Sequence, residues 1–348
     1  MEKRNNLIYF ILIGIFISFL SSCLNIEPIK NNLYITSVGL EKEEDDYIIT
    51  AYYLCSQDVG KSSYVSDNCF GTIKSKGKTL TEAFVKIDKG VTQLINYSMV
   101  KSYILHKSFM NKDSLEEFNS LYKTSSEKSH NFYLFYTSDK IDEIYNTSNP
   151  DKISLFYNIF SNPKSNLYID SNSRPLHFIE YIRTYNLGFY SIKIPELSKN
   201  DIKLNEEDED KKITIISGVS YYNNNTILSF KNKEYEQFRL IEDQDNVVIN
   251  FDNLSCNLNN YKYKISVKNN EIYIKLSYDI KIISNKGNKN IKEIESLIKE
   301  YLNDNIYSIL ELSDEYKIDL LNINYEFYKQ NKTIVNEYKT LPLVVIIK

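Results

Sequence analysis

The sequence predicts an α+β fold: three small mixed α/β domains with antiparallel or mixed sheets and flanking helices. Three observations favour it. In the first half, runs of β-branched and aromatic residues alternate with amphipathic helical stripes. Residues 261–283 have the pattern of a hairpin, and a helical stripe follows it through residue 312. Residues 203–212 are a charged run, which is typical of a solvated linker.

The N-terminal segment is typical of an export signal. Lys3 and Arg4 precede an uncharged apolar run from Leu7 to Leu20, which is shorter than the ~20 residues that a membrane-spanning helix needs. We therefore expect residues 1–22 to be a cleaved signal peptide. An ordinary secretory signal with an incidental cysteine, or a tilted N-terminal anchor, is the alternative to the lipoprotein signal described next.

The end of this segment, Leu20-Ser21-Ser22-Cys23, resembles the lipobox of bacterial lipoproteins. In that motif the cysteine thiol receives a diacylglycerol, cleavage occurs just before the cysteine, and the new amino group is usually acylated. Each buried CH₂ contributes ~0.8 kcal/mol, so two or three long chains hold a protein durably to a bilayer. Cys23 is therefore the predicted lipidation site, and residues 23–32 are the expected tether.

Composition indicates a globular protein outside the nucleic-acid-binding classes. Hydrophobic residues make up 42% and charged residues 25% of the chain, as in ordinary globular domains. The formal charge is −4, and removing residues 1–22, with one acidic and two basic side chains, makes it −5. No clustered basic face is expected, so nucleic acid is not a predicted partner. The 30 tyrosines occur with abundant Asn, Lys and Ile, which indicates an AT-rich genome rather than a ligand platform.

Cysteine and histidine spacing predicts no metal site and no cofactor. Besides Cys23 the chain has three cysteines, which cannot all pair with one another: Cys55, Cys69 and Cys256. A bridge between the first two is one possibility outside the cytoplasm. The three histidines lie far apart in sequence and are expected to be ordinary fold residues: His106, His130 and His177.

The first domain, residues 33–200, is expected to alternate strands and helices. Two capping boxes, Thr79–Glu82 and Ser114–Glu117, are predicted to open helices, the first of which should extend over residues 80–96. The other expected helices are residues 139–145 and 175–185. The expected strands are residues 34–40, 47–54, 69–74, 99–105 and 131–137.

Two further domains are expected after residue 200. A small middle domain, residues 201–256, should contain strands at 213–222, 226–230 and 246–251 and a short helix at 234–240. The C-terminal domain, residues 257–348, should contain the 261–283 hairpin, a helix over 291–312, and closing strands at 318–328 and 343–347.

Motifs that would indicate catalysis do not occur in the sequence. There is no G-x-G-x-x-G, G-x-x-x-x-G-K-[ST], H-E-x-x-H or G-x-S-x-G. Asp243-Gln244-Asp245-Asn246 begins like a calcium loop but lacks the central glycine and the acidic residue at position 12, so a plain loop is the better interpretation. We therefore expect no catalytic residues and no enzyme activity.

Five features of the chain occur together: the lipobox, Val38–Lys42, Gly77–Ala83, Ile216–Val219, and the order of the C-terminal hairpin and helix. In this combination the chain resembles one family, the Ger(x)C (GerAC-like) lipoprotein subunits of spore germinant receptors, in which Gly77–Ala83 is similar to the motif G-K-[ST]-x-x-E-A. The chain departs from the family at Leu24-Asn25, where Trp-Asp is common, at residues 97–101, and in the short stretch 329–342. These departures affect partner-facing surfaces more than the fold.

The resemblance implies a non-enzymatic subunit that is anchored to the bilayer through the Cys23 diacylglycerol. It implies assembly with membrane-embedded A-type and B-type receptor subunits on the outer face of the spore inner membrane, in a response to small nutrients. An extracytoplasmic solute-binding lipoprotein of a transporter is the alternative. The antiparallel 261–283 hairpin disfavours that alternative, which needs repeated β-α-β lobes around a cleft. An anchored hydrolase would need reactive groups that the sequence does not offer.

Overall fold

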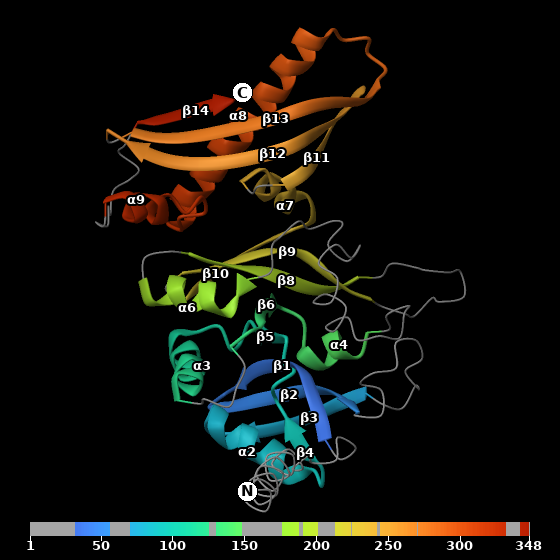
Figure 1. The fold of residues 1–348 in the computed structure, drawn as a ribbon, viewed down its shortest axis with the longest axis vertical. Helices are drawn as coiled ribbons and strands as arrows, with labels where there is room; N and C mark the ends of the chain where they lie inside the picture. Colours follow the sequence, from blue (N-terminus) through green and yellow to red (C-terminus); the bar gives the residue numbers. More distant parts are fainter. Residues whose placement is uncertain are drawn as a thin grey trace, which may run out of the picture.

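A computed structural model describes residues 32–55, 70–124, 130–147, 176–187, 191–200, 213–223, 225–241, 244–269, 271–331 and 342–347. In these residues the chain forms two sheets with flanking helices (Figure 1). The first sheet has the strand order β10-β9-β8-β6-β5-β1-β2-β3, with β4 beside β1 and β7 beside β6. The second has the order β11-β12-β13-β14. The predicted mixed α/β fold is confirmed.

Four parallel strands form the centre of the first sheet: β1 (Asn32–Glu43), β5 (Ser102–His106), β6 (Tyr133–Thr137) and β8 (Ile192–Asn200). Antiparallel strands extend it on both sides: β2 (Asp46–Cys55) and β3 (Phe70–Gly77) next to β1, and β9 (Ile213–Asn223) and β10 (Thr226–Lys231) next to β8. The short strands β4 (Leu94–Asn96) and β7 (Leu176–His177) complete it.

Helices cover the first sheet unequally. On one face α2 (Leu80–Gly90), α3 (Lys112–Thr124) and α6 (Phe178–Leu187) bury apolar side chains in a common core, with a dense group of aromatic rings around Phe118. The short α4 (Ile141–Tyr145) packs in a separate cluster with Tyr52, Ile104 and Phe135. Figure 1 shows α4 on the side of the sheet away from α2, α3 and α6.

The first predicted helix begins where expected but ends early. Thr79 accepts a hydrogen bond from the Glu82 amide at 3.0 Å, while the Glu82 carboxylate accepts from the Lys78 amide, one residue before the expected partner. The helix stops at Gly90 instead of residue 96, because the next apolar residues join the sheet as β4, with Leu94 opposite Asn32 of β1. The apolar spacing that predicted one helix over residues 80–96 thus includes residues that form strand β4.

The predicted capping box at Ser114 is wrong. Helix α3 begins two residues earlier, and the Ser114 amide donates to the Asn111 side chain at 3.0 Å, so Asn111 is the cap. Glu117, the expected partner, instead accepts from the Leu80 amide at 2.6 Å. This contact satisfies a free amide in the first turn of α2 and joins the two helices.

The second sheet and its long helix match the predicted pattern. β12 (Leu254–Lys268) and β13 (Glu271–Asn285) form the hairpin, with Asn269 in the left-handed conformation at the turn. β11 (Gln244–Phe251) and β14 (Leu343–Ile347) are the edges. Helix α8 (Ile291–Tyr316) begins with a capping box between Asn290 and Glu293. The predicted stripe starts at Ile291, which is wrong because this residue is 52% exposed, but the rest of it is buried: Ile294, Ile298, Leu302, Ile306 and Ile309.

The strand predicted at 318–328 is wrong, because helix α9 (Ile323–Asn331) occupies most of this stretch. Both carboxylate oxygens of Asp319 accept backbone amides at the start of the helix, from Ile323 at 3.0 Å and Asn324 at 2.8 Å. Ile323 and Phe327 are buried one turn apart. The alternating apolar residues that resembled a strand also fit this helical spacing.

The segment expected to be a middle domain is shared between the two sheets. β9 and β10 belong to the first sheet, β11 to the second, and α7 (Asn232–Phe238) with the 3-10 turn Arg239–Ile241 connects them. Apolar side chains from β9, β10, α7 and the second sheet form one continuous core. The division into folding units 33–200, 201–256 and 257–348 stays a prediction, but hydrogen bonding does not follow it.

Two glycines allow unusually close packing. A Cβ atom on Gly39 would lie 2.2 Å from Ile141 Cγ2, so the absence of a side chain lets α4 approach β1. A Cβ atom on Gly218 would lie 2.0 Å from the backbone carbonyl oxygen of Phe230 in β10. A backbone atom in a paired strand cannot rotate away as a side chain can.

None of the described helices has the length and apolar character needed to cross a bilayer.

Replacing Gly218 with alanine should lower the free energy of unfolding by about 1–3 kcal/mol, because the added methyl group pushes β10 away from β9. The matched control is Gly90→Ala, where nothing lies within 4 Å of the added Cβ and no loss is expected. Urea unfolding followed by circular dichroism measures both. Equal stability of the two variants would contradict the assigned β9–β10 packing.

Candidate functional site

The predicted lipidation site, Cys23, lies outside the described residues, together with the signal peptide 1–22 and residues 23–31 of the tether. Cys69 is outside them too, so its bridge with Cys55 stays a prediction. Cys256 on β12 is buried and unpaired, and burial raises the pKa of its thiol. It behaves as a small apolar core residue.

The three histidines occupy separate places and have local partners. His106 Nδ1 lies 2.8 Å from Ser108 Oγ, His130 Nε2 lies 3.2 Å from the Tyr122 carbonyl oxygen, and His177 Nε2 lies 3.2 Å from Asn131 Oδ1. Each histidine therefore takes part in a local contact of its own part of the fold. Across the described ranges, no three His, Cys, Asp or Glu side chains gather as a possible metal site.

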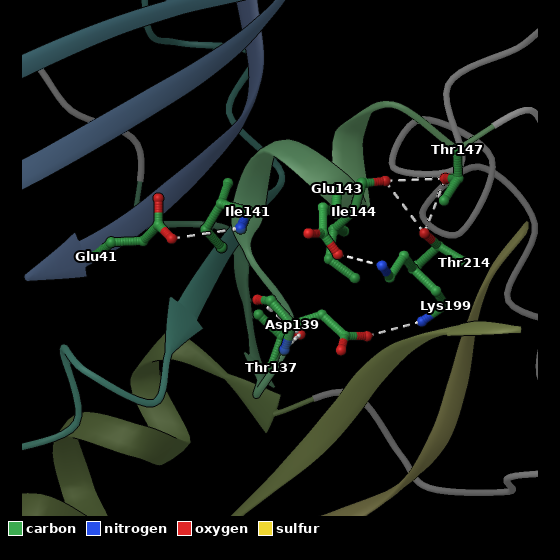
Figure 2. A network of polar contacts seen from close by, with 9 residues as sticks. All are labelled: Glu41, Thr137, Asp139, Ile141, Glu143, Ile144, Thr147, Lys199 and Thr214. Carbon is green, nitrogen blue, oxygen red and sulfur yellow. Dashed lines mark hydrogen bonds and ion pairs between the residues drawn. The ribbon is translucent and has the colours of Figure 1, made fainter. Parts of the chain in front are cut away.

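The carboxyl ends of parallel strands are the usual place for ligand sites in open α/β sheets. In this chain helix α4 covers that edge (Figure 2). At its start the Ile141 amide donates to Glu41 of β1 at 3.5 Å, and burial raises the pKa of the Glu41 carboxyl. At its end Thr147 Oγ1 lies 2.8 Å from Thr214 Oγ1 of β9, and both hydroxyls donate to the Ile144 carbonyl.

Lys199 of β8 fixes the same helix from the other side. Its amide donates to Asp139 Oδ2 at 3.0 Å, and its ammonium group pairs with Glu143 (Figure 2). Lys74 of β3 forms a further ion pair with Asp142. Strands from both halves of the first sheet are thus connected through one short helix. Helix α4 therefore covers the edge of the first sheet at which open α/β sheets usually bind ligands.

A serine and a histidine lie together at the end of β5, an arrangement that can support nucleophilic catalysis. The geometry here is that of a turn. The Ser108 amide and hydroxyl both lie within hydrogen-bond distance of His106 Nδ1, while the hydroxyl also accepts from the Lys42 amide at 3.0 Å. Burial lowers the pKa of His106, and a hydrogen bond with the Ser138 backbone opposes the shift. The pair holds β1, β5 and β6 together at their ends.

The most buried charge in the first sheet is Glu196 of β8, whose side chain is fully inaccessible to solvent. Lys231 Nζ of β10 lies 2.7 Å from its Oε1, and Ser220 of β9 donates to its Oε2 at 2.9 Å. Ser138 after β6 lies near both charges, with its Oγ 3.0 Å from Lys231 Nζ and 3.3 Å from Glu196 Oε1. Removing a charge from water is costly, so this carboxylate depends on its partners.

Sequence reasoning missed this cluster. Glu196 was expected at the end of a domain, whereas β8 continues through it and carries a bulge between Glu196 and Leu197 that changes which residues face inward. The local sequence offers only an acidic residue between Pro195 and Leu197, which is no motif. Its partner lies 35 positions later in the sequence, which spacing rules do not reach.

The two sheets meet at a second buried junction. Ser191, just before β8, donates to the Asp319 carbonyl oxygen at 2.5 Å and so connects the first sheet to the segment between α8 and α9. Tyr261 of β12 donates to the carbonyl oxygen of Leu240, in the connection between the sheets, at 2.6 Å. Lys193 lies opposite Tyr221 in the β8–β9 register, and burial lowers the pKa of its ammonium group to about 7. Polar contacts and a common apolar core therefore hold the sheets together.

Comparisons with known proteins identify the first half of the chain. A family model described as the spore germination protein N-terminal domain matches residues 25–197. The crystal structure of the GerBC protein is similar, with a TM-score of 0.51, 16% sequence identity, and coverage of 89% of this chain and 95% of that chain. At this identity the likeness shows a shared fold. No curated protein matches the chain.

Replacing Lys231 with methionine should destabilise the protein by about 2 kcal/mol, since it leaves the Glu196 carboxylate buried without its cation. The loss should be below that of a fully buried pair because Lys231 is 35% exposed. Adding Glu196→Gln to this variant should restore most of the stability. A double-mutant cycle from urea unfolding measures the coupling, and additive single effects would contradict a direct pair.

Proposed function

Because the chain belongs to the GerAC-like family of spore germination proteins, we propose that it is the C subunit of a spore germinant receptor complex, needed for the germination response to small nutrients. The match over residues 25–197 is the observation that carries the proposal. The fold shared with the GerBC protein extends the likeness over 89% of the chain and supports it.

The proposed subunit is non-enzymatic. The charged and hydroxyl groups at the edge of the first sheet are engaged with one another and with α4, as described for Glu41, Lys199 and Glu196. Their contacts connect strands and do not converge on a shared point where a substrate could react. A role through binding surfaces fits this arrangement better than covalent chemistry.

Membrane attachment is proposed to occur through a diacylglycerol on Cys23. Asn32, where β1 begins, lies nine positions after Cys23, and nine extended Cα–Cα steps span at most ~30 Å. Near this point Leu94 of β4 is 60% exposed. The tether would therefore keep this end of the first sheet close to the outer face of the spore inner membrane.

The proposed partners are the membrane-embedded A-type and B-type subunits of the receptor. A solute-binding lipoprotein of a transporter is the alternative function. Such proteins close two similar β-α-β lobes around a cleft, whereas here a ten-stranded mixed sheet packs beside a mainly antiparallel one. The asymmetry between the two sheets supports the receptor subunit.

The two functions differ in the proteins that should co-purify. We expect the tagged chain, purified from detergent-solubilised inner membranes of dormant spores, to retain two multi-spanning membrane proteins that mass spectrometry identifies as A-type and B-type subunits. A tagged lipoprotein unrelated to germination is the control. Recovery of a transporter permease with its ATPase would contradict the receptor assignment and favour the alternative.

Replacing Cys23 with alanine should release the protein from membranes and impair germination, because the thiol that accepts the lipid is lost. Membranes are washed at high salt before immunoblotting, which removes protein held by charge alone. Ser22→Ala keeps a small residue before the cysteine and is the matched control, which should stay bound. Retention of the Cys23 variant after the wash would contradict the lipid anchor.

A further inference from the structure

The connection between β13 and α8 combines apolar and basic residues without any acidic ones. Residues 280–292, here called the β13–α8 tip, contain four isoleucines, four lysines and no Asp or Glu. The whole chain has 46 acidic against 42 basic residues, so such a stretch departs from its average composition. The four lysines are all exposed: Lys281, Lys286, Lys289 and Lys292.

Three of the isoleucines also face solvent. Ile282 is 41%, Ile283 58% and Ile291 52% exposed, although burial is the ordinary state of this residue type. They alternate with the lysines along the tip and flank its turn on both sides. Single exposed apolar residues need no explanation, but three within ten positions form a local group that points to an interaction.

Hydrogen bonds fix the shape of the tip. The Asn285 side chain accepts from the Lys289 amide at 3.0 Å and donates to the Lys289 carbonyl at 2.8 Å. The Lys286 amide donates to the Asn253 carbonyl at 2.9 Å, which connects the tip to the neighbouring β11–β12 turn. Figure 1 shows this loop at the outer end of the second sheet, on the side away from the first sheet. The tip is a protruding, ordered feature.

The uncovered face of the second sheet continues the basic character. Lys264 of β12 lies directly opposite Lys275 of β13, a like-charge pair that costs stability when both face the same side. Lys262 precedes this pair on the same face, and Lys281 belongs both to β13 and to the tip. Such repulsion is relieved when a negatively charged surface binds.

Acidic groups near the tip are few and partly engaged. The Glu293 carboxylate accepts from the Asn290 amide at 2.9 Å within the capping box of α8. Asp279 accepts from the Asn260 side chain at 2.8 Å. Asp252 is exposed in the adjacent β11–β12 turn. Glu271, opposite Lys268 on the same sheet face, and the exposed Glu295 near the start of α8 are further acidic neighbours, whereas the tip itself carries four lysines and no carboxylate.

From this combination we propose that the β13–α8 tip is a docking site for an anionic lipid bilayer. The lysines bind lipid phosphates, and Ile283 and Ile291 enter the boundary between headgroups and acyl chains. The lysines alone would be enough to bind an acidic protein, and the exposed isoleucines would then have no role. Exposed isoleucines between lysines on a protruding loop fit a surface that is negatively charged outside and apolar within.

This contact acts in addition to the Cys23 lipid and does not require it. Figure 1 places the tip and β4, beside which β1 begins, at opposite ends of the molecule, so both contacts with one bilayer require the long axis to lie along its surface. The test uses the mature chain, residues 23–348, with Cys23→Ala, so that no lipid is attached. The protein is sedimented with vesicles of neutral phosphatidylcholine, or of phosphatidylcholine mixed with phosphatidylglycerol. We expect binding to the mixed vesicles that weakens as salt is raised, and little binding to the neutral vesicles.

Two variants test whether the tip lysines and isoleucines bind the vesicles. Replacing all four tip lysines with glutamine should weaken partitioning to mixed vesicles at least about a hundredfold. Ile283→Ser with Ile291→Ser should weaken it about tenfold while keeping the net charge. The matched control replaces four exposed lysines on α2 and α3 with glutamine and should bind as the parent does: Lys86, Lys89, Lys112 and Lys123. Circular dichroism confirms that each variant is folded.

Three results would overturn the proposal: equal binding to both vesicle types, equal loss in the control and tip variants, or binding to polyglutamate without binding to vesicles. The last would indicate an acidic protein as the partner. None of these results bears on receptor assembly, because the co-purification experiment uses the lipidated chain. The two proposals therefore fail independently.

Discussion

Val219, Tyr221 and Phe230 on β9 and β10 pack into the same apolar core as the second sheet and α8, and this shared packing constrains the rest of the molecule. The first sheet cannot bury the outer face of β9 without the second sheet, and the second sheet loses part of its core without β9. Cores of this kind are dense and resist gradual deformation. The position of the second sheet, and of the tip at its outer end, is thus set by contacts near the middle of the chain (Figure 1).

Sequence reasoning succeeded where one pattern had one structural solution. Strict alternation over the β12–β13 hairpin, the apolar stripe of α8 and the Thr79 cap all follow from short-range rules. It failed where the same spacing of apolar residues fits both a helix and a strand. Apolar residues around Leu94 fit a helix until pairing with β1 makes them a strand, and Ile323 with Phe327 fits both spacings until Asp319 caps a helix.

The candidate site depended on contacts between distant positions. Glu196 and Lys231, or Lys199 and Glu143, meet only after the sheet has assembled, and no local motif marks them. Cys23 lies at the other extreme, since adjacent residues alone mark it, whereas the tip became evident only from the exposure of its isoleucines. The lipid anchor and the basic, isoleucine-bearing tip would give the chain two bilayer contacts of different chemistry, one permanent and one dependent on salt and lipid charge.

The strand order of the first sheet also affects how the protein forms during synthesis. The match to the spore germination protein N-terminal domain stops at residue 197, within β8. Strands β9 and β10 nevertheless extend the same sheet to residue 231. Until those strands leave the ribosome, β8 is an open edge, and α4 lacks its contact with Thr214. A fragment ending at the domain match would keep that edge permanently and should aggregate, whereas the intact chain closes it within some thirty further residues.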